Sequence, residues 1–321
     1  FNSISVSAVT LSNVSNLIFK NVTLDATLGS HGVEFINTCS NILFYGCKII
    51  ANLSATSTTN VGVMFYSGSG ATKLLNNVRF IKNEIKGGYA NIYMYYPCGS
   101  STYMSQSSIV IDSNTMTDAY YAGIYSYYYG YFPSISHNSI TSRANISNTF
   151  YGMYLNYYNT VDYLDGNKIK IATSSSAYGV YCYYLNNTGY NATNPCLMIN
   201  NEISMNTTST CYGIYQYYPR TTISHNSIYL TTTTTTYGIY AYINSSTYFT
   251  NINRNNMYIS SPGTVYMMYN GPGTSYLTSA YWLLDYNNYY KVNAPTTYYG
   301  YTSYTTLAQW KASGNGQDAN S

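Results

Sequence analysis

The chain has little charge: charged residues supply only 7% of its 321 positions, and the formal net charge is +3. Nucleic-acid binding needs clustered lysine and arginine, so this scarcity argues against a nucleic-acid partner. The longest apolar runs, such as 16–19, are far shorter than a membrane-spanning helix, which argues against membrane insertion. The chain is nonetheless 45% hydrophobic and 17% aromatic, which is enough for a folded core.

Cysteine is present, but never as a CxxC pair, which argues against a zinc or redox motif. In an oxidising compartment, Cys39 with Cys47 and Cys182 with Cys196 are candidates for local disulfides. Small, buried, unpaired thiols are an equal alternative, and the sequence leaves both open. The wealth of Ser, Thr, Asn and Tyr is typical of secreted proteins, and a start at Phe1 without a signal peptide suggests a processed or trimmed product. We therefore expect an extracellular or cell-surface location.

Tyrosine, by contrast, is abundant, with 45 residues, and it belongs to a repeat of about 29 residues. One phrase is a glycine followed by an aliphatic residue and, directly or one position later, an aromatic residue; it begins at Gly32, Gly62, Gly123, Gly152, Gly179, Gly213 and Gly238. A second phrase, N-x-[IM], keeps step with the first and begins at Asn83, Asn114, Asn138, Asn167, Asn201, Asn226 and Asn255. A Ser/Thr-rich stretch of variable length follows each copy of the second phrase.

Two short strands and one variable loop in each period predict the coils of a solenoid. The first phrase alternates with period two, as a strand does, and no apolar stripe of helical period occurs before the C-terminal tail. The predicted fold is therefore all-β, a single parallel β-solenoid of about nine or ten coils. We expect it to occupy residues 1–283, followed by an irregular closing segment over 284–321.

The phrases G-[IV]-Y and I-x-x-N-x-I resemble the right-handed parallel β-helix repeats of the pectate-lyase-like superfamily. ISHNSI occurs twice, at 135–140 and 223–228. The tail over 284–321 resembles the segment that closes such repeats in secreted surface proteins of Bacteroidetes-type bacteria. The resemblance implies a right-handed coil and a surface location, but not one function, because such coils serve lyases, hydrolases, adhesins and passive stalks alike.

Strand alternation sorts the side chains of the repeat. The aliphatic residue after each glycine is predicted to face the core, and the glycine itself to turn the chain at positive φ. The asparagines of the second phrase are predicted to stack inside one corner and to hydrogen-bond from coil to coil. The opposite parity places two columns of tyrosines on the outside, which we take as the candidate binding surface: Tyr125, Tyr127, Tyr154, Tyr181, Tyr183, Tyr215, Tyr217, Tyr240 and Tyr242.

Acidic residues are scarce, with ten in the chain, although glycoside hydrolases need paired carboxylates for acid and base chemistry. Asp162 and Asp165 are the best candidates for a catalytic or Ca²⁺-binding pair, but no third carboxylate recurs one period away. His137 and His225 occupy the same slot three periods apart, about 14 Å along the axis, so they cannot share a metal ion. We read them as exposed strand residues, and we expect no catalytic site, no metal and no cofactor.

N-x-[ST] sequons are frequent, although a chain so rich in Asn, Ser and Thr produces many by chance. The threonine tract 231–236 is a candidate for O-linked sugar. The glycosylation candidates in or beside the variable loops are Asn52, Asn145, Asn186, Asn191 and Asn206, and Asn244 is a further candidate.

Two hypotheses of function follow from these patterns. The first is a non-enzymatic structural or adhesive surface protein, a filament or stalk subunit, whose tyrosine columns contact other copies of the protein or glycans. The second is a carbohydrate-binding or polysaccharide-cleaving module, in which the tyrosines stack on sugar rings. A third interpretation of the tyrosines is purely structural, because tyrosine is a good strand former and stacks across coils.

Overall fold

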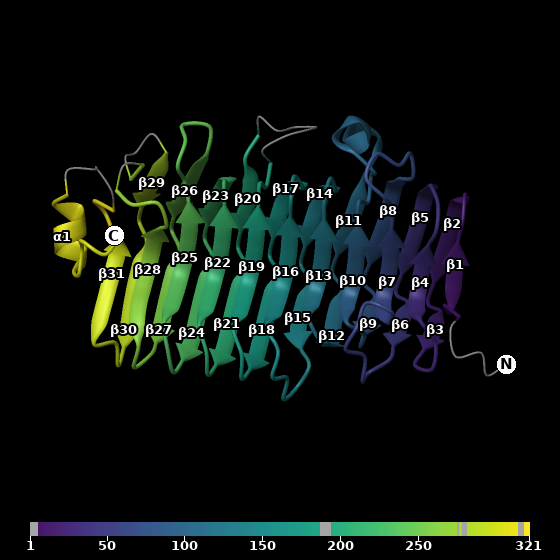
Figure 1. Cartoon of the computed structure of the whole chain (residues 1–321), viewed down its shortest axis with the longest axis horizontal. Coiled ribbons are helices and arrows are strands. Elements are labelled where there is room, and N and C mark those ends of the chain that lie inside the picture. The colour runs from purple at the N-terminus through teal and green to yellow at the C-terminus, as the bar shows by residue number, and fades with distance from the viewer. Residues whose placement is uncertain (1–5, 187–193, 275, 278–280, 314–317) are drawn as a thin grey trace.

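The computed structural model describes residues 6–186, 194–274, 276–277, 281–313 and 318–321. It is a straight stack of short strands, with the chain advancing from one end of the stack to the other (Figure 1). All strand pairs between successive coils are parallel, and each coil gives one strand to each of three sheets. The predicted all-β parallel solenoid is thereby confirmed.

Sheet A contains the glycine–aromatic phrases. Its strands, in spatial order, are β1 (Val9–Leu11), β4 (His31–Phe35), β7 (Val61–Tyr66), β10 (Ala90–Tyr95), β13 (Ala122–Tyr127), β16 (Phe150–Asn156), β19 (Ala177–Tyr183), β22 (Cys211–Tyr217), β25 (Thr236–Tyr242), β28 (Thr264–Asn270) and β31 (Thr296–Gly300).

Sheet B follows sheet A along the chain. The sequence predicted two strands in each coil and missed the strand of sheet B, because the outward residues of this strand follow no repeated phrase. Its strands are β2 (Ser15–Lys20), β5 (Cys39–Tyr45), β8 (Leu75–Ile81), β11 (Ile109–Asp112), β14 (Tyr131–Ser136), β17 (Thr160–Asp165), β20 (Cys196–Ile199), β23 (Arg220–Ser224), β26 (Phe249–Asn253) and β29 (Trp282–Asp285).

Most strands of sheet C begin directly after the asparagine of an N-x-[IM] phrase. Its strands are β3 (Thr23–Ala26), β6 (Lys48–Ala51), β9 (Glu84–Lys86), β12 (Thr115–Ala119), β15 (Ser139–Ser142), β18 (Lys168–Thr173), β21 (Glu202–Thr207), β24 (Ser227–Thr232), β27 (Asn256–Ser260) and β30 (Asn288–Val292). A 3₁₀ helix (Ser101–Gln106) and the helix α1 (Leu307–Lys311) complete the described elements.

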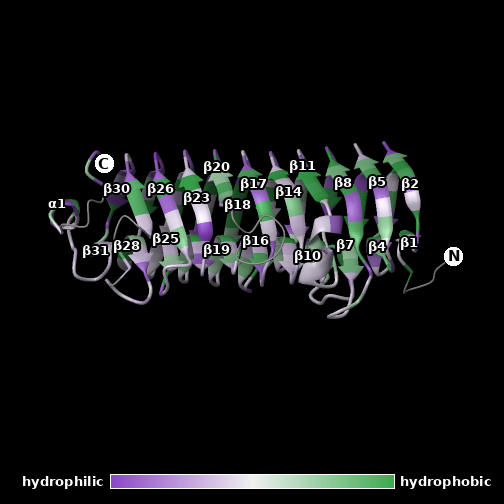
Figure 2. Ribbon diagram, turned by 90° about the horizontal axis from the view of Figure 1, so that it is seen from above, coloured by the Kyte–Doolittle hydropathy of each residue, from purple (hydrophilic) through white to green (hydrophobic). Residues whose placement is uncertain are grey.

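The core runs along the axis of the stack and is filled by the inward-facing residues of all three sheets. Figure 2 shows hydrophobic and hydrophilic segments alternating along the strands, as expected when one face of each strand is buried. The residues predicted to face inward, such as Ile124, Leu155 and Gln216, are fully or almost fully buried. Inward and outward parity on sheet A was therefore predicted correctly.

The asparagines at the corner between sheets B and C form one continuous buried ladder. Each side-chain oxygen accepts from the main chain and the side chain of the preceding asparagine; Asn201 Oδ1 lies 3.0 Å from both Asn167 N and Asn167 Nδ2. The ladder continues from Asn83 to Asn287, and Cys47 takes the same position one coil before Asn83. The predicted coil-to-coil bonding of these amides is confirmed.

The glycines of sheet A are required for a different reason from the one predicted. Gly152, Gly179 and Gly213 do not have positive φ. Instead, a Cβ on Gly179 would lie 2.4 Å from the carbonyl oxygen of Gly213 and 2.6 Å from Ile203 Cγ2. Glycine is needed because neighbouring coils and the core isoleucine approach the main chain too closely for any side chain.

The predicted disulfides are not formed, and all six cysteines are buried free thiols. Cys39 is the first residue of β5, whose seven residues span roughly 20 Å, and Cys47 lies two residues beyond the end of that strand. A disulfide needs Cα atoms within about 7 Å, so that pairing was wrong. Cys182 on β19 and Cys196 on β20 face the same core from neighbouring sheets, but their sulfur atoms are not bonded.

The coils continue past the boundary predicted at residue 283, which falls inside β29. Strands β30 and β31 extend sheets C and A, and the closing segment proper begins after Gly300. Asp318 then ends the ladder: its carboxylate accepts from Asn287 Nδ2 at 3.1 Å and from Trp310 Nε1 at 2.9 Å. The tail therefore closes this end of the stack (Figure 1, yellow).

Candidate functional surface

Three columns of tyrosine cover the outside of sheet A, and we call them together the tyrosine face. The middle column pairs strand by strand in register, so that Tyr154 is opposite Tyr181 and Tyr181 is opposite Tyr215. The first column consists of Tyr151, Tyr178, Tyr212, Tyr237, Tyr266 and Tyr298; the middle column of Tyr93, Tyr125, Tyr154, Tyr181, Tyr215, Tyr240 and Tyr269; the third column of Tyr66, Tyr95, Tyr127, Tyr183, Tyr217 and Tyr242.

The middle and third columns were predicted to lie outside, and their side chains are partly exposed there, except Tyr93, which is buried. The first column was not among the residues predicted for this surface. It lies on the same outer surface, with its rings at right angles to the middle column: the planes of Tyr212 and Tyr215 make 89°. The tyrosine face is thus wider than the sequence pattern predicted.

The rings of each column are stacked along the axis of the solenoid. In the middle column, the ring centroids of Tyr154 and Tyr181 are 4.8 Å apart with planes 9° from parallel, and those of Tyr215 and Tyr240 are 4.6 Å apart at 1°. Rings lying flat on the sheet could not come so close, because a phenol ring is wider than this spacing. Each ring therefore has its flat faces covered by its neighbours, and the column presents ring edges and hydroxyls outward.

These phenols are protonated at neutral pH, as an ordinary tyrosine is, and burial among neighbouring rings moves their titration to still higher pH. Desolvation, together with nearby tyrosines, raises the pKa of Tyr154 and Tyr215 to about 12 and raises that of Tyr181 further. A neutral phenol both donates and accepts a hydrogen bond. At neutral pH the tyrosine face is therefore an array of uncharged hydroxyls.

A further row of tyrosines lies at the corner where the chain leaves sheet A for sheet B. These residues follow the last strand residue of five successive coils and have positive φ between 52° and 64°. Their rings stack as well; Tyr96 and Tyr128 are 4.4 Å apart, and Tyr184 and Tyr218 are 4.7 Å apart. This corner row consists of Tyr96, Tyr128, Tyr157, Tyr184 and Tyr218.

The corner row was not predicted. A tyrosine directly after each of five successive sheet A strands is visible in the sequence, but no simple sequence rule places a bulky side chain in a left-handed conformation. From β10 to β28, neither the strands of sheet A nor the corner row contains Asp, Glu, Lys or Arg. The tyrosine face and the corner row therefore form one uncharged aromatic surface.

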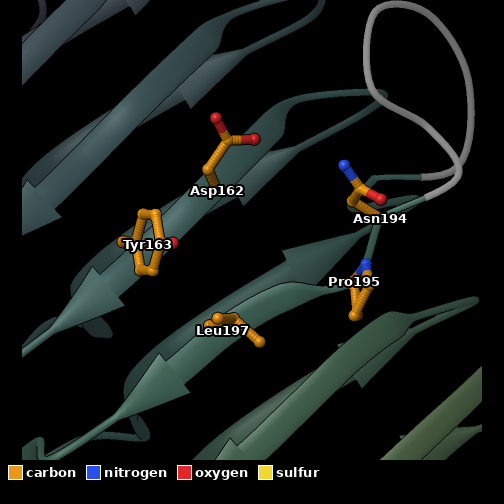
Figure 3. A pocket seen from close by; sticks show the side chains of 5 residues that line it. All are labelled: Asp162, Tyr163, Asn194, Pro195 and Leu197. Carbon is orange, nitrogen blue, oxygen red and sulfur yellow. The ribbon is translucent and has the colours of Figure 1, made fainter.

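Asp162 and Asp165, the weak catalytic candidates, both lie on β17 but have different partners. Asp162 accepts a hydrogen bond from the Tyr131 hydroxyl at 2.7 Å, and Asp165 accepts one from Asn200 Nδ2 at 3.0 Å. Asp162 borders a shallow depression, which Figure 3 shows with its lining residues Asp162, Tyr163, Asn194, Pro195 and Leu197.

Asp162 is the only carboxylate in that lining. Over the described part of the chain, no group of three or more His, Cys, Asp or Glu side chains is arranged to hold a metal ion. His137 and His225 are corner residues with φ of 54° and 58°, and not strand residues as we had read them.

The glycosylation candidates divide into three groups. Asn186 is wrong as a candidate, because its side chain is fully buried and its oxygen accepts from Val161 N at 2.8 Å. Asn191 lies outside the described residues. The remaining four are exposed or half-exposed, and their modification stays a prediction: Asn52, Asn145, Asn206 and Asn244.

A short tyrosine column on sheet C also escaped the sequence analysis. Tyr229, Tyr258 and Tyr290 pair in register on β24, β27 and β30, and their ring centroids are 4.5 and 5.2 Å apart. Tyr229 and Tyr290 are about half exposed. The same residue type is thus stacked on two faces of the molecule, but only sheet A carries several adjacent columns.

Comparison with known proteins adds no relative: no family model, no curated protein and no solved structure matches the chain. Among the described residues, no helix is long and apolar enough to span a membrane. The arguments about function therefore depend on the geometry of this surface.

Proposed function

We propose that the protein is a non-enzymatic structural or adhesive module of an extracellular or cell-surface assembly, with the tyrosine face and the corner row as its contact surface. The repeat phrases and the tail support a place among right-handed parallel β-helix proteins of the pectate-lyase-like superfamily, in a secreted surface protein of a Bacteroidetes-type bacterium. The surface is wide, regular and uncharged, which suits a passive contact better than a catalytic cleft.

The corner row is the observation that carries this proposal. Its tyrosines are not strand residues, so a preference of tyrosine for strands does not explain them. A left-handed conformation costs a non-glycine residue about 1–2 kcal/mol, and ring stacking returns only about 0.5–1.5 kcal/mol. Stability alone therefore does not favour tyrosine over glycine or asparagine at these positions.

The corner between sheets B and C provides a comparison within the same molecule. It has the same positive φ, yet it accommodates Gly46, Lys82, Ser113, Gly166 and Asn200. A repeated left-handed position in this solenoid thus tolerates many residue types. The consistent use of tyrosine in the corner row supports a role for the exposed rings.

Glycan binding is the second candidate for this surface. The stacked rings argue against a sugar lying flat on a tyrosine, because the ring faces are already covered within each column. The outward hydroxyls still provide donors and acceptors for a polysaccharide chain. Exposed sequons such as Asn145 and Asn206, which border one shallow depression, support a glycosylated surface away from the tyrosine face.

Binding to printed polysaccharides and to immobilised copies of the protein tests the proposal. We expect wild type to bind at least one of these and the triple variant Tyr181→Ser, Tyr215→Ser, Tyr240→Ser to lose that binding. The matched control is Tyr229→Ser, Tyr258→Ser, Tyr290→Ser on sheet C, which should bind like wild type. Binding to neither probe, binding that survives in the first variant, or turnover of any polysaccharide would contradict the proposed function.

A further inference from the structure

We propose that the partner of the tyrosine face is the tyrosine face of a second copy, with the two solenoids lying side by side about a two-fold axis. This inference rests on the proposed function and identifies the occupant of its contact surface. It is carried by three properties of the surface: its hydrogen-bonding groups, its lack of charge and its size.

The hydrogen-bonding groups of the tyrosine face are complementary to themselves. Each phenol donates one hydrogen bond and accepts others, so two identical arrays of hydroxyls are able to bond to each other. Tyrosine ordinarily titrates near pH 10, and burial raises the pKa of Tyr181 and Tyr240 further, so neither face carries negative charge at neutral pH. A surface of donors alone, or of one charge, would repel its own copy.

The two faces also share one spacing. Successive rings of the middle column are 4.5–5.0 Å apart from Tyr93 to Tyr240, and a two-fold-related copy repeats at the same interval. A two-fold interface uses the same patch on both subunits, so every contact is made twice. Regular columns therefore stay matched over the full length of the face.

The size of the face fits a stable pair. Six coil steps from β10 to β28, at about 4.8 Å each, and seven-residue strands, at about 3.3 Å per residue, give a plane of roughly 30 by 23 Å. This is about 700 Å² on each copy without the corner row, close to the ~800 Å² per partner of a standard interface. Sheet C offers no comparable patch, since its tyrosine column is one residue wide.

Sedimentation velocity over a wide concentration range, with the full chain, tests the inference. We expect wild type to form a reversible dimer. The variant Tyr183→Lys, Tyr217→Lys, Tyr242→Lys places like charges opposite each other at the interface and should raise the dissociation constant at least about tenfold. The matched control is Tyr229→Lys, Tyr258→Lys, Tyr290→Lys, three stacked tyrosines on sheet C, and it should dimerise like wild type.

A mixing experiment identifies the face that meets the partner. The lysine variant mixed with Tyr183→Glu, Tyr217→Glu, Tyr242→Glu should form a mixed dimer. If the tyrosine face contacts the tyrosine face of the other copy, the introduced lysines and glutamates lie opposite each other and attract; if another surface forms the contact, they do not meet. If the charged variants do not fold, the variant Tyr183→Asn, Tyr217→Asn, Tyr242→Asn replaces them, since Asn156 already occupies this column. This asparagine variant should weaken the dimer.

A wild-type monomer up to the solubility limit, or a dimer unchanged in these variants, overturns the inference. A monomer that still binds polysaccharide through Tyr181, Tyr215 and Tyr240 overturns the self-pairing alone and leaves the proposed function standing.

Discussion

Replacing one ladder asparagine should be far more damaging than replacing an exposed asparagine on the same coil. Asn201 is 2% exposed, and its Oδ1 accepts from Asn167 N and Asn167 Nδ2, both at 3.0 Å. Its Nδ2 donates to Leu164 O at 2.8 Å and to Asn226 Oδ1 at 2.9 Å. In Asn201→Ala, two buried donors on Asn167 lose their acceptor, at about 1–3 kcal/mol each, so we expect a loss of about 4 kcal/mol.

Native-state hydrogen exchange is the appropriate assay, because a solenoid can open coil by coil and its unfolding is then not two-state. The amides of β20 to β24 should exchange faster by the factor that corresponds to this loss, and those of the first coils should change little. The control Asn206→Ala removes an exposed side chain from β21 and should cost less than about 0.5 kcal/mol. A cost below about 1 kcal/mol for Asn201→Ala would refute the claim that the ladder holds the coils together.

Four further changes test other parts of the structure. Tyr218→Gly should leave the free energy of unfolding within about 1 kcal/mol of wild type in urea titration, because relief of the left-handed strain offsets the lost ring contacts; a larger loss would contradict the strain argument. All six cysteines should resist alkylation in the native protein, because they are buried and burial raises the pKa of Cys211 to about 12. When the protein is unfolded without reductant, it should take up six adducts; fewer adducts would indicate disulfides. Burial lowers the pKa of His31 below its ordinary value of 6.5, although Glu34 opposes the shift, so the unfolded state binds the proton more readily. The stability that this difference contributes is fully present above pH 6.5 and is lost as the pH falls below 6.5. The difference in stability between about pH 7.5 and 5.5 should therefore be smaller in His31→Asn than in wild type, and an unchanged difference would argue against this role. Trp310→Ala removes a fully buried indole that donates to Asp318, so it should lower the free energy of unfolding by about 3–5 kcal/mol. We expect faster amide hydrogen exchange in β29 to β31. Unaltered exchange in these strands would contradict closure of this end of the stack by the tail.

The sequence was most informative where one residue type is demanded once in every coil. Only glutamine carries the same amide donor and acceptor as the ladder asparagines, and its side chain is one methylene longer, so Asn167 and Asn201 recur visibly and the corner was located correctly. The period-two pattern around Gly179 likewise fixed which residues of sheet A face the core, because only one parity is apolar.

Features that depend on the spatial relation between coils were not predictable. Sheet B escaped because its outward positions vary freely, from Arg220 to Asp165, so no repeated phrase marks its strands. The reason for the glycine at Gly179 is the carbonyl of the next coil, which the sequence does not display. Asn186 has the sequon of an exposed glycosylation site, yet its amide is used inside the fold, because the sequon describes neighbours in sequence and not burial.

The candidate surface was predicted in part for the same physical reason. Tyr154, Tyr181 and Tyr215 were correctly predicted to lie outside, because successive side chains of a strand point to opposite faces and this alternation can be read from the sequence. The stacking that covers their ring faces, and the corner row beside them, arise from the distance between coils and from a left-handed turn. Those two features argue against the second hypothesis, a sugar stacked on flat rings, and favour a partner that meets hydroxyls and ring edges.

A structure of the native assembly, determined by electron cryomicroscopy, tests the central claim most directly. The account predicts that the tyrosine face and the corner row are covered, with Tyr181 and Tyr215 of one copy against the tyrosine face of another. An assembly in which these residues face solvent, while the contacts lie on sheet B or sheet C, would contradict it.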